Sequence, residues 1–323
     1  MPPDAPLHGI RVVDLGWLTA GAASATLLHD LGAEVVKVEG PGALDPFRDW
    51  AGADPGSDWW NRSPFFLFTN RGKRSVCLDL KDGRGQAALF RLLETADVLV
   101  ENYRRGVLAS FGLDPRILRA RFPRLVIASI SSQGEDGPER DMVSFGSTLE
   151  ATAGLGAMTG PEGDPHITGR NINYPDQVVC LFAAGAIIAA LARRDATGEG
   201  THLDLSQREL TSFLLGEEFI AAAAGVQPAP RPAPETAYRD GATLAASADF
   251  QRGTAILRDP AGQPAKGVPW RFGGQPHRLT AGCATLGADN RAVLGAAGLP
   301  AAELDALEQA GVLATAPRKK PAA

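Results

Sequence analysis

The chain has 323 residues, of which 44% are apolar, and its formal net charge is −5 at pH 7. This composition supplies a sizeable hydrophobic core and is typical of a globular protein with one large domain and an appended segment. Because the charge is mild and no block of like charges is longer than Arg318, Lys319 and Lys320, we expect neither nucleic acid nor a membrane surface as a partner.

Cysteine usage and apolar runs point to a reducing compartment. Cys77, Cys180 and Cys283 lie far apart without CxxC spacing, which fits neither a disulfide framework nor a zinc site. We therefore expect free thiols, a cytoplasmic location and no metal. Residues 1–7 lack the basic and apolar regions of a signal peptide. The apolar stretch 178–191 is shorter than the ~20 residues of a membrane span and predicts a core helix.

Short apolar runs alternate with helix-like segments through the first 130 residues. Strands are predicted at residues 10–15, 33–38, 97–101 and 125–130, and helices at residues 24–31, 83–96 and 114–122. Continuously apolar strands alternating with helices predict an α/β fold, with a Rossmann-like open, mostly parallel sheet and helices on both faces. Ligands of such sheets bind beyond the carboxyl ends of the strands, which are residues 17–21, 39–42, 102–105 and 131–134. Residues 14–23 read DLGWLTAGAA, without the GxGxxG of a dinucleotide site.

Residues 59–79 combine an aromatic cluster with a basic loop containing Asn70, Arg71, Lys73 and Arg74. Basic and aromatic side chains together suit a phosphate group or an adenine ring. The same composition also describes a solvated turn after a core strand. Both readings remain open from the sequence.

Asp176 stands where a loop becomes an apolar helix, predicted over residues 176–194. The free N–H groups and positive dipole end of a helix favour an ionised carboxylate and can stabilise an oxyanion on an attacked carbonyl. Asp176 is therefore either a candidate nucleophile or an ordinary helix cap, since Asp is a preferred N-cap residue. A strand at residues 201–205 and a helix at residues 207–224 follow. Residues 226–235 (VQPAPRPAPE) read as a linker, and the next clear helix is at residues 301–311.

Five stretches together resemble the class III CoA-transferases, the formyl-CoA transferase and carnitine CoA-transferase group, whose relatives include the alpha-methylacyl-CoA racemases. These stretches, in order, are GIRVVDLGWLTAGAASATLLHDLGAEVVKVE, LFTNRGKRSVCLDLK, ADVLVENYRRGVL, PRLVIASISSQGEDGP, and the run from Asp176 through LFAAGAIIAALARRDATGEGTHLDLS. The resemblance covers residues 9–225 and, more weakly, residues 252–313.

The resemblance implies that Asp176 is the catalytic nucleophile and that CoA moves between an acyl-CoA thioester and a carboxylic acid. The implied intermediates are an aspartyl anhydride and an aspartyl-CoA thioester, with CoA and acyl-CoA as substrates and no tightly bound cofactor. It also implies contacts to CoA from three groups of residues, which are Trp17, Thr19 and Ala20, then Leu78, Asp79, Leu80 and Lys81, and finally Asn102, Tyr103 and Arg104. From residue type alone, Asn102 suits a hydrogen bond to the nucleotide or pantetheine part. Lys81 and Arg104 suit either phosphate or solvent.

The sequence departs from the family pattern in several places. No histidine lies in the run Val143 to Gly146, which counts against racemisation, and His166 is a lone loop histidine. Gly40 and Ser110 replace two CoA-binding arginines of formyl-CoA transferase, and Gly146 replaces an acidic residue.

Most of the family's small domain is expected to be missing. We predict a large domain over residues 1–226, a linker over residues 227–250, and a C-terminal segment over residues 251–323 that returns to the large domain. Gly273 and Gly274 come too late in the chain to be matched to the family's glycine-rich loop.

Three functional hypotheses follow. The first is a CoA-transferase that acts through Asp176. The second is a catalytically impaired subunit that acts with a full-length partner. The third, an acyl-CoA racemase, is the least supported. The resemblance implies acyl-CoA and a carboxylic acid as ligands, in a homodimer or in a heteromer with a paralogous subunit. Asn171, Asn173, Tyr174 and Gln177 suit either substrate recognition or hydrogen bonding within the loop.

Overall fold

A computed structural model describes residues 5–50, 58–159, 173–226, 241–248, 256–262, 264–268, 270–272, 275–277 and 279–318. The predicted linker at residues 227–250 lies outside these ranges, apart from residues 241–248, which begin with the short helix α11 (Gly241–Ala246). His166, Asn171, Gly273 and Gly274 also lie outside the described residues.

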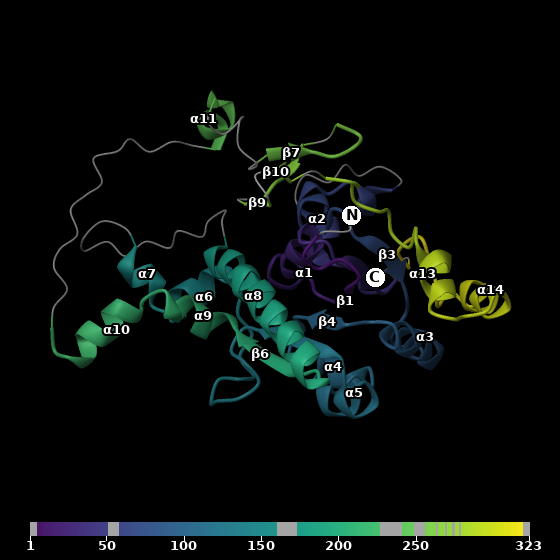
Figure 1. Cartoon of the computed structure of the whole chain (residues 1–323), viewed down its shortest axis with the longest axis horizontal. Helices are drawn as coiled ribbons and strands as arrows, with labels where there is room; N and C mark the ends of the chain where they lie inside the picture. Colours follow the sequence, from purple (N-terminus) through teal and green to yellow (C-terminus); the bar gives the residue numbers. More distant parts are fainter. Residues whose placement is uncertain are drawn as a thin grey trace, which may run out of the picture.

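The architecture is built on a six-stranded sheet (Figure 1). Its strands are β1 (Arg11–Asp14), β2 (Glu34–Glu39), β3 (Arg74–Cys77), β4 (Val98–Glu101), β5 (Val126–Ser131) and β6 (His202–Ser206). The spatial order is β3-β2-β1-β4-β5-β6, and every neighbouring pair is parallel. This is the doubly wound order, in which the order of successive strands reverses between β1 and β4, and ligands characteristically bind at this switch point. The predicted α/β fold with a parallel sheet is confirmed.

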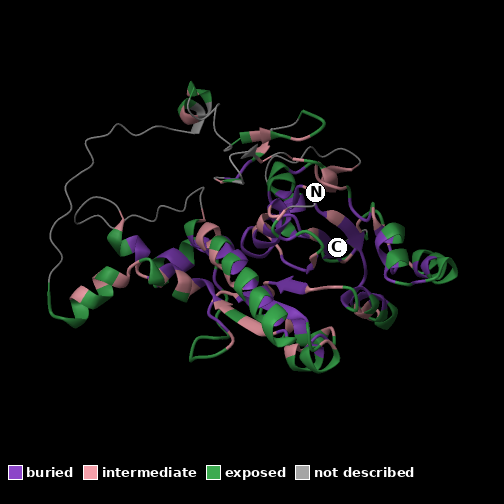
Figure 2. Ribbon diagram, viewed as in Figure 1, coloured by how far each residue is buried: buried purple, intermediate pink, exposed green. Residues whose placement is uncertain are grey.

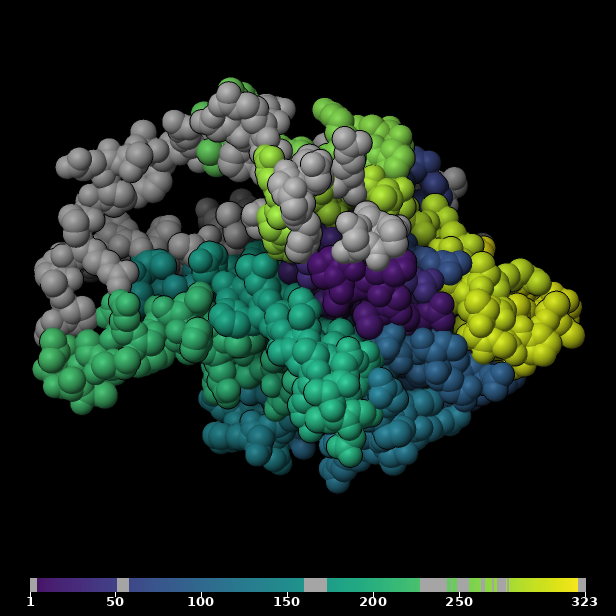
Figure 3. Space-filling view, viewed as in Figure 1, coloured from purple at the N-terminus to yellow at the C-terminus, as the bar shows by residue number. Residues whose placement is uncertain are grey.

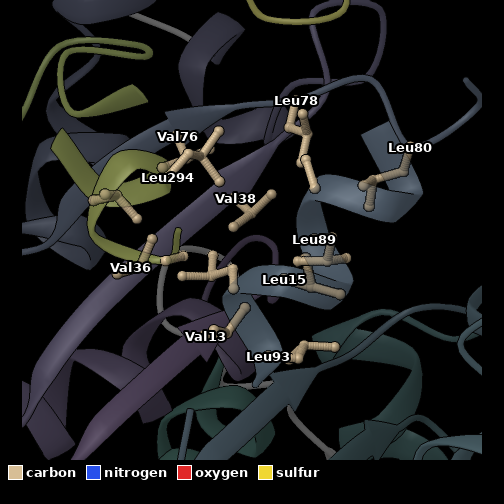
Figure 4. Packing of buried hydrophobic residues seen from close by; sticks show 14 of the residues in the cluster. Val13, Leu15, Val36, Val38, Val76, Leu78, Leu80, Leu89, Leu93 and Leu294 are labelled. Carbon is tan, nitrogen blue, oxygen red and sulfur yellow. The ribbon is translucent and has the colours of Figure 1, made fainter. Parts of the chain in front are cut away.

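The strands carry apolar side chains on both faces of the sheet, and helices cover each face. On one face, Val12, Val35 and Val126 pack with residues of α1 (Ala20–Asp30) and α8 (Tyr174–Thr197). On the other face, Val13 and Val36 pack against helices from two distant parts of the chain. These helices are α3 (Gly83–Leu93), α5 (Pro115–Arg121), α13 (Asn290–Ala296) and α14 (Ala301–Gln309). Figure 4 shows Leu89 and Leu294 meeting the strands in this second core.

Shorter elements complete the described chain. They are η1 (Pro46–Asp49), η2 (Trp59–Asn61), α2 (Pro64–Asn70), α4 (Val107–Ser110), α6 (Gly146–Thr152), α7 (Leu155–Met158), α9 (Gln207–Phe213) and α10 (Gly216–Ala223). Two antiparallel pairs, β7 (Ile256–Arg258) with β8 (Pro264–Lys266) and β9 (Arg271–Phe272) with β10 (Gln275–Pro276), lie outside the main sheet. The single helix predicted over residues 207–224 is wrong, because the chain turns before Gly216, a weak helix former.

The basic loop before β3 is neither a phosphate site nor a solvated turn. The Nζ of Lys73 lies 2.7 Å from Asp14 Oδ2, and both side chains are almost completely buried. The Nη2 of Arg71 donates to Asp30 Oδ2 at 2.7 Å, also in the interior. Both sequence readings of this loop are therefore wrong, because its cations neutralise buried carboxylates on β1 and α1.

Residues 285–318 complete the outer edge of β3. The backbone N–H groups of Ser75 and Cys77 donate to the side chains of Asp289 and Asn290, each at 2.8 Å. The next outward N–H, that of Asp79, donates to Val312 O at 2.9 Å. Residues from the C-terminal part of the chain thus bind the free N–H groups of the edge strand β3. Figure 1 shows α13 beside this strand.

Helix α8 is long and apolar enough to span a membrane, but length and composition alone are weak evidence for a membrane span. Val179, Ala183 and Ile187 on this helix are completely buried against the sheet and α1. Figure 2 shows buried and exposed residues alternating along it. This one-sided burial is the pattern of a core helix.

Candidate active site

A cavity of about 1370 Å³ opens at the carboxyl ends of the central strands. Its walls come from the segments after β1, β4, β5 and β6, from η1, and from the first turns of α6 and α8. The lining residues include Leu18, Ala20, Asn102, Tyr103, Arg104, Gln133, Ser144, Gly146, Asn173, Asp176 and Gln207. The cavity therefore lies at the edge of the sheet where the topology predicts a ligand.

Asp176 is the third residue of α8 and lines this cavity. The N-cap position is occupied by Asn173, not by Asp176, so the reading of Asp176 as the cap is wrong. Burial raises the pKa of the Asp176 carboxyl from 3.8 to about 6, and a hydrogen bond from the Asn173 side chain only partly opposes this effect. Loss of solvation therefore outweighs the effect of the helix end on this pKa, and the carboxyl is largely ionised only above about pH 6.

Gly146 allows Asn173 to approach Asp176. A Cβ atom on Gly146 would lie 2.7 Å from the Cβ, Cγ and Oδ1 atoms of Asn173, closer than carbon atoms pack. The Asn173 side chain makes no capping bond to the helix backbone and is hydrogen-bonded to Asp176 instead. The absence of a side chain at position 146 thus creates the space in which the Asp176 partner sits.

Four of the residues predicted to contact CoA line the cavity, namely Ala20, Asn102, Tyr103 and Arg104. Asn102 uses its amide to hold the loop after β1, since its Oδ1 accepts from Trp17 N at 2.6 Å and its Nδ2 donates to Trp17 O at 3.0 Å. The Tyr103 ring packs edge-on against Trp17, with centroids 5.3 Å apart. Trp17 and Thr19 belong to the same loop but do not line the cavity.

The loop after β1 has an unusual backbone conformation that the sequence did not reveal. Leu18 has φ 56°, in the left-handed region that a branched side chain rarely adopts. Its N–H donates to both carboxylate oxygens of Asp45, at 3.1 and 3.2 Å. Asp45 is buried beside Lys37, whose Nζ lies 3.1 Å away and also donates to Gly16 O. A buried ion pair therefore stabilises a strained residue at the cavity wall.

The predicted contact residues Leu78, Asp79, Leu80 and Lys81 do not line the cavity. The side chains of Leu78 and Leu80 pack in the core (Figure 4), Asp79 pairs with Arg318 at 2.6 Å, and Lys81 is exposed. Their role in CoA binding stays a prediction. Gly40 and Ser110, where formyl-CoA transferase has arginines, also lie outside the cavity lining.

Sequence reasoning placed Gln133 in a strand-end segment, residues 131–134, without singling it out, and it missed Gln207 in the cavity wall. Gln207 directly follows β6, and that position is the signal that would have indicated it. Gln133 is 3% exposed and Gln207 is 7% exposed. The Nε2 of Gln133 donates to Ser144 Oγ at 3.0 Å.

Comparison with known proteins identifies the family. The sequence model of CoA-transferase family III matches residues 7–250. The chain belongs to this family.

Three curated relatives illustrate the similarity. The succinate–glutarate CoA-transferase of Agrobacterium fabrum is 38% identical over 216 residues, which are 66% of this chain and 54% of that protein. The succinyl-CoA–D-citramalate CoA-transferase of Chloroflexus aurantiacus is 38% identical over 204 residues, covering 63% of this chain and 49% of that protein. The alpha subunit of the succinyl-CoA–L-malate CoA-transferase of Chloroflexus aurantiacus is 34% identical over 221 residues, covering 68% and 50%. The chain thus spans about half the length of the curated relatives it matches.

Two solved structures show the same fold. A CAIB/BAIF family protein from Brucella suis superposes with a TM-score of 0.82 at 23% identity, covering 91% of this chain and 99% of that chain. Rv3272 from Mycobacterium tuberculosis superposes with a TM-score of 0.76 at 24% identity, covering 88% and 98%. At this level of identity the likeness concerns the fold alone.

Proposed function

We propose that the protein transfers CoA between an acyl-CoA thioester and a carboxylic acid, with Asp176 as the nucleophile. The observation that carries this proposal is a carboxylate in the first turn of α8 that faces a large cavity at the sheet's carboxyl edge. Membership of CoA-transferase family III and relatives named as CoA-transferases support the reaction class.

The reaction balances with one protein carboxylate. Asp176 attacks the thioester carbonyl, the C–S bond breaks, and CoA leaves as a thiolate from an aspartyl anhydride. The thiolate then attacks the aspartyl carbonyl, which releases the first acid as its carboxylate and leaves an aspartyl-CoA thioester. The acceptor carboxylate attacks this thioester, forming a new anhydride and thiolate, and attack of the thiolate on the acceptor's acyl carbon yields the new acyl-CoA and free Asp176. Because the donor acid, Asp176 and the acceptor acid are all carboxylic acids, the two anhydrides are close in energy and one nucleophile serves both halves of the reaction.

The cavity wall offers groups for the CoA part of the substrate. Arg104 is exposed at the cavity. Its guanidinium forms no salt bridge with a described residue, which suits it to bind a phosphate. The loop after β1 is held by Asn102, so its backbone is positioned before any ligand arrives. We include Trp17, Thr19, Ala20, Leu78, Asp79, Leu80, Lys81, Asn102 and Tyr103 in the proposed CoA site on the basis of the family resemblance.

A second chain is part of this proposal. Helix α10 has no buried residue, and its large apolar side chains are exposed, Phe219 by 53% and Ile220 by 72%. The neighbouring Phe213, at the end of α9, is 69% exposed. Apolar exposure on this scale is typical of an interaction surface. We infer that this surface binds another copy of the chain or a paralogous subunit, and the relative named as an alpha subunit supports the latter.

Trapping the acyl-enzyme tests the function. The protein is incubated with succinyl-CoA and hydroxylamine, and peptides are analysed by mass spectrometry. We expect a hydroxamate on Asp176 that is absent from the Asp176→Asn variant. An Asp176 that stays unmodified in the isolated chain, but is modified once a full-length family member is added, would support the alternative of a subunit that needs a partner. An unmodified Asp176 under both conditions would contradict the proposed chemistry.

A further inference from the structure

Glu101 is a buried carboxyl group at the end of β4 that the proposed reaction does not use. It is 4% exposed and directly precedes Asn102, Tyr103 and Arg104, which line the cavity. The backbone N–H of Tyr103 donates to Glu101 Oε2 at 2.9 Å. The carboxyl group therefore lies behind the cavity wall and is hydrogen-bonded to the backbone of that wall.

Two further side chains extend this contact into a relay. Glu101 is paired in register with Ser129 on β5, and the two side chains are hydrogen-bonded. Ser129 Oγ in turn lies 2.9 Å from Nε2 of His202 on β6. Ser129 is 1% exposed, whereas His202 is only half-buried. The relay of Glu101, Ser129 and His202 thus runs from the cavity wall towards solvent.

The relay is satisfied with or without a proton on Glu101. A serine hydroxyl both donates and accepts, and a neutral histidine presents either an N–H or a lone pair at Nε2. When Glu101 is ionised, Ser129 donates to the carboxylate and accepts from His202. When Glu101 is protonated, it donates to Ser129, which donates to His202. An oxygen of Glu101 remains available to the Tyr103 N–H in both states, so the wall keeps its hydrogen bond when the charge changes.

The surroundings of Glu101 disfavour its negative charge. Burial, with a smaller contribution from the charges of Glu135 and Asp204, raises the pKa of Glu101 to about 7, although the hydrogen bonds from Ser129 and Tyr103 oppose this effect. Near neutral pH, a small change in the local electrostatic potential is therefore enough to protonate the group.

His202 and the neighbouring cation Arg105 complete the charged surroundings. Burial lowers the pKa of His202, so the ring is neutral at pH 7. The charged groups that act on this ring are Glu135, Asp204, Arg119 and Asp114. The Nε of Arg105 lies 3.8 Å from Glu135 Oε2, and its Nη1 lies 3.1 Å from Asp141 Oδ1. Arg105 is thus shared between two other carboxylates.

Bound CoA would supply the change in potential. Arg104, the proposed phosphate ligand, follows Glu101 by three residues, so their Cα atoms are at most about 11 Å apart. Two like charges about 10 Å apart in a protein change an equilibrium roughly tenfold. Phosphate groups at Arg104 therefore disfavour a carboxylate at position 101.

We propose that Glu101 takes up a proton from solvent when CoA binds, while the relay with Ser129 and His202 keeps the cavity wall in place. This inference rests on the proposed function, in particular on its CoA site. The step balances as the binding of one proton by one carboxylate. It removes a negative charge from behind the phosphate site, so CoA binds more tightly once Glu101 is neutral.

Selective labelling measures the proton directly. The chain has three tyrosines, so labelling with 15N-tyrosine gives few amide signals, and Tyr103→Phe identifies that of Tyr103. Because this N–H donates to Glu101, its chemical shift should titrate with a midpoint at about pH 7 in the free chain. We expect saturating CoA to raise the midpoint by about one pH unit. Glu101→Gln should abolish the titration, and a midpoint that CoA leaves unchanged or lowers would overturn the proposal.

Calorimetric titration with CoA measures the effect on affinity. Glu101→Gln removes the charge permanently, so its Kd should equal that of the unmodified chain at about pH 6 and be about three- to tenfold lower at about pH 8.5. Titration of the CoA phosphates and of Asp176 is common to both proteins and cancels in this ratio. Glu94→Gln removes an exposed carboxylate at the end of α3 and should match the unmodified chain. Equal affinities of Glu101→Gln and the unmodified chain at the higher pH would refute the proposal.

Ser129→Ala tests the relay separately from the charge. Loss of a hydrogen bond that favours the ionised form should raise the midpoint of the Tyr103 titration in the free chain. An unchanged midpoint would show that the relay does not exist and would overturn the proposal. If thermal unfolding shows that Glu101→Gln does not fold, this variant decides the result.

The outcomes are separable from those for the proposed function. A midpoint that CoA raises, without a hydroxamate on Asp176, would support proton uptake and overturn the proposed chemistry. A hydroxamate together with an unchanged midpoint would do the reverse. A chain to which CoA does not bind at any pH would overturn both.

Discussion

Asp176 experiences two opposing electrostatic effects. The start of α8 favours a charged carboxylate, whereas burial raises the pKa of this group to about 6. A carboxylate with a pKa near 6 is ionised at neutral pH and is more basic than a solvated aspartate. The position therefore provides a charged nucleophile under cellular conditions, at some expense of folded-state stability.

This expense leads to a prediction about stability and pH. Because the folded-state pKa of Asp176 lies above its unfolded value of 3.8, the folded state binds more protons between about pH 4 and pH 6. The contribution of Asp176 is thus most favourable below pH 3.8 and is lost as pH rises to about 6, by up to about 3 kcal/mol. Asp176→Asn should raise the thermal unfolding midpoint by several degrees at pH 7.5 and by much less at pH 4. Equal shifts at both pH values would show that the carboxylate is not destabilised by burial.

The same pKa predicts the pH dependence of chemistry. Only the carboxylate attacks a thioester, so the initial rate of hydroxamate formation on Asp176 should rise with pH and level off above about pH 6. Rates measured from pH 4.5 to 7.5 at fixed hydroxylamine free-base concentration test this expectation. A rate that is constant down to pH 4.5 would contradict it.

Gly146 provides a test of the contact that positions Asp176. Gly146→Ala places a methyl group 2.7 Å from Asn173, so Asn173 must move and the hydrogen bond to Asp176 should be lost. We expect kcat to fall about tenfold with little change in KM, and the pH midpoint of the reaction to rise because that hydrogen bond favours the carboxylate. As a control, Gly185→Ala in α8, the helix that carries Asp176, meets no atom within 4 Å and should be neutral or stabilising. An unchanged pH profile in Gly146→Ala would show that Asn173 does not tune Asp176.

At the scale of elements, the segment before β3 illustrates the limit of prediction from sequence. Its aromatic and basic composition was visible, but the partners of Arg71 and Lys73 are Asp30 and Asp14, which lie more than 40 residues away. No local pattern specifies such pairs. By contrast, β1, β2, β4 and β5 followed directly from apolar runs, because both faces of a parallel sheet are buried. Strand β3 was not predicted, because only two of its four residues, RSVC, are apolar. Helix α13 was missed because its seven residues are too few to show a helical period.

The buried pair of Lys73 and Asp14 should matter for folding. Lys73→Met leaves Asp14 charged, or forces its protonation, in the interior, so we expect a loss of about 3–5 kcal/mol in the free energy of unfolding. Urea denaturation monitored by tryptophan fluorescence measures it. As a matched control, Arg291→Met removes an exposed pair with Glu308, 2.9 Å away, and should change stability far less. Similar losses in the two variants would refute a special role for the buried pair.

At the scale of the whole molecule, α10 extends to the side of the sheet domain (Figure 3). Its apolar residues were visible in the sequence, which predicted a helix here, yet the described chain buries no residue of α10. An apolar sequence pattern indicates that a helix face is buried, but it does not indicate whether the same chain or another chain buries it. The candidate site was also predicted only in part. Asp176 and residues 102–104 were indicated by the sequence, whereas the hydrogen bonds from Leu18 N to the Asp45 carboxylate depend on tertiary structure.

Association through α10 should be sensitive to charge. Ile220→Glu places a carboxylate on a position that is 72% exposed and apolar, so it should leave folding intact and shift the chain towards monomers in sedimentation velocity experiments. Ile117→Glu on α5, which is 53% exposed, should leave the distribution unchanged. An identical oligomeric state of Ile220→Glu and the unmodified chain would remove α10 from the interface.

The outer edge of β3 has a consequence for synthesis in the cell. Its amide groups are matched by Asp289, Asn290 and Val312, which the ribosome produces more than 200 residues after the strand itself. Until then a nascent chain presents a ready template on which strands of other molecules can add. The interval before release is therefore when chaperones are most needed, and premature termination upstream of Asp289 would yield aggregates instead of a smaller working domain.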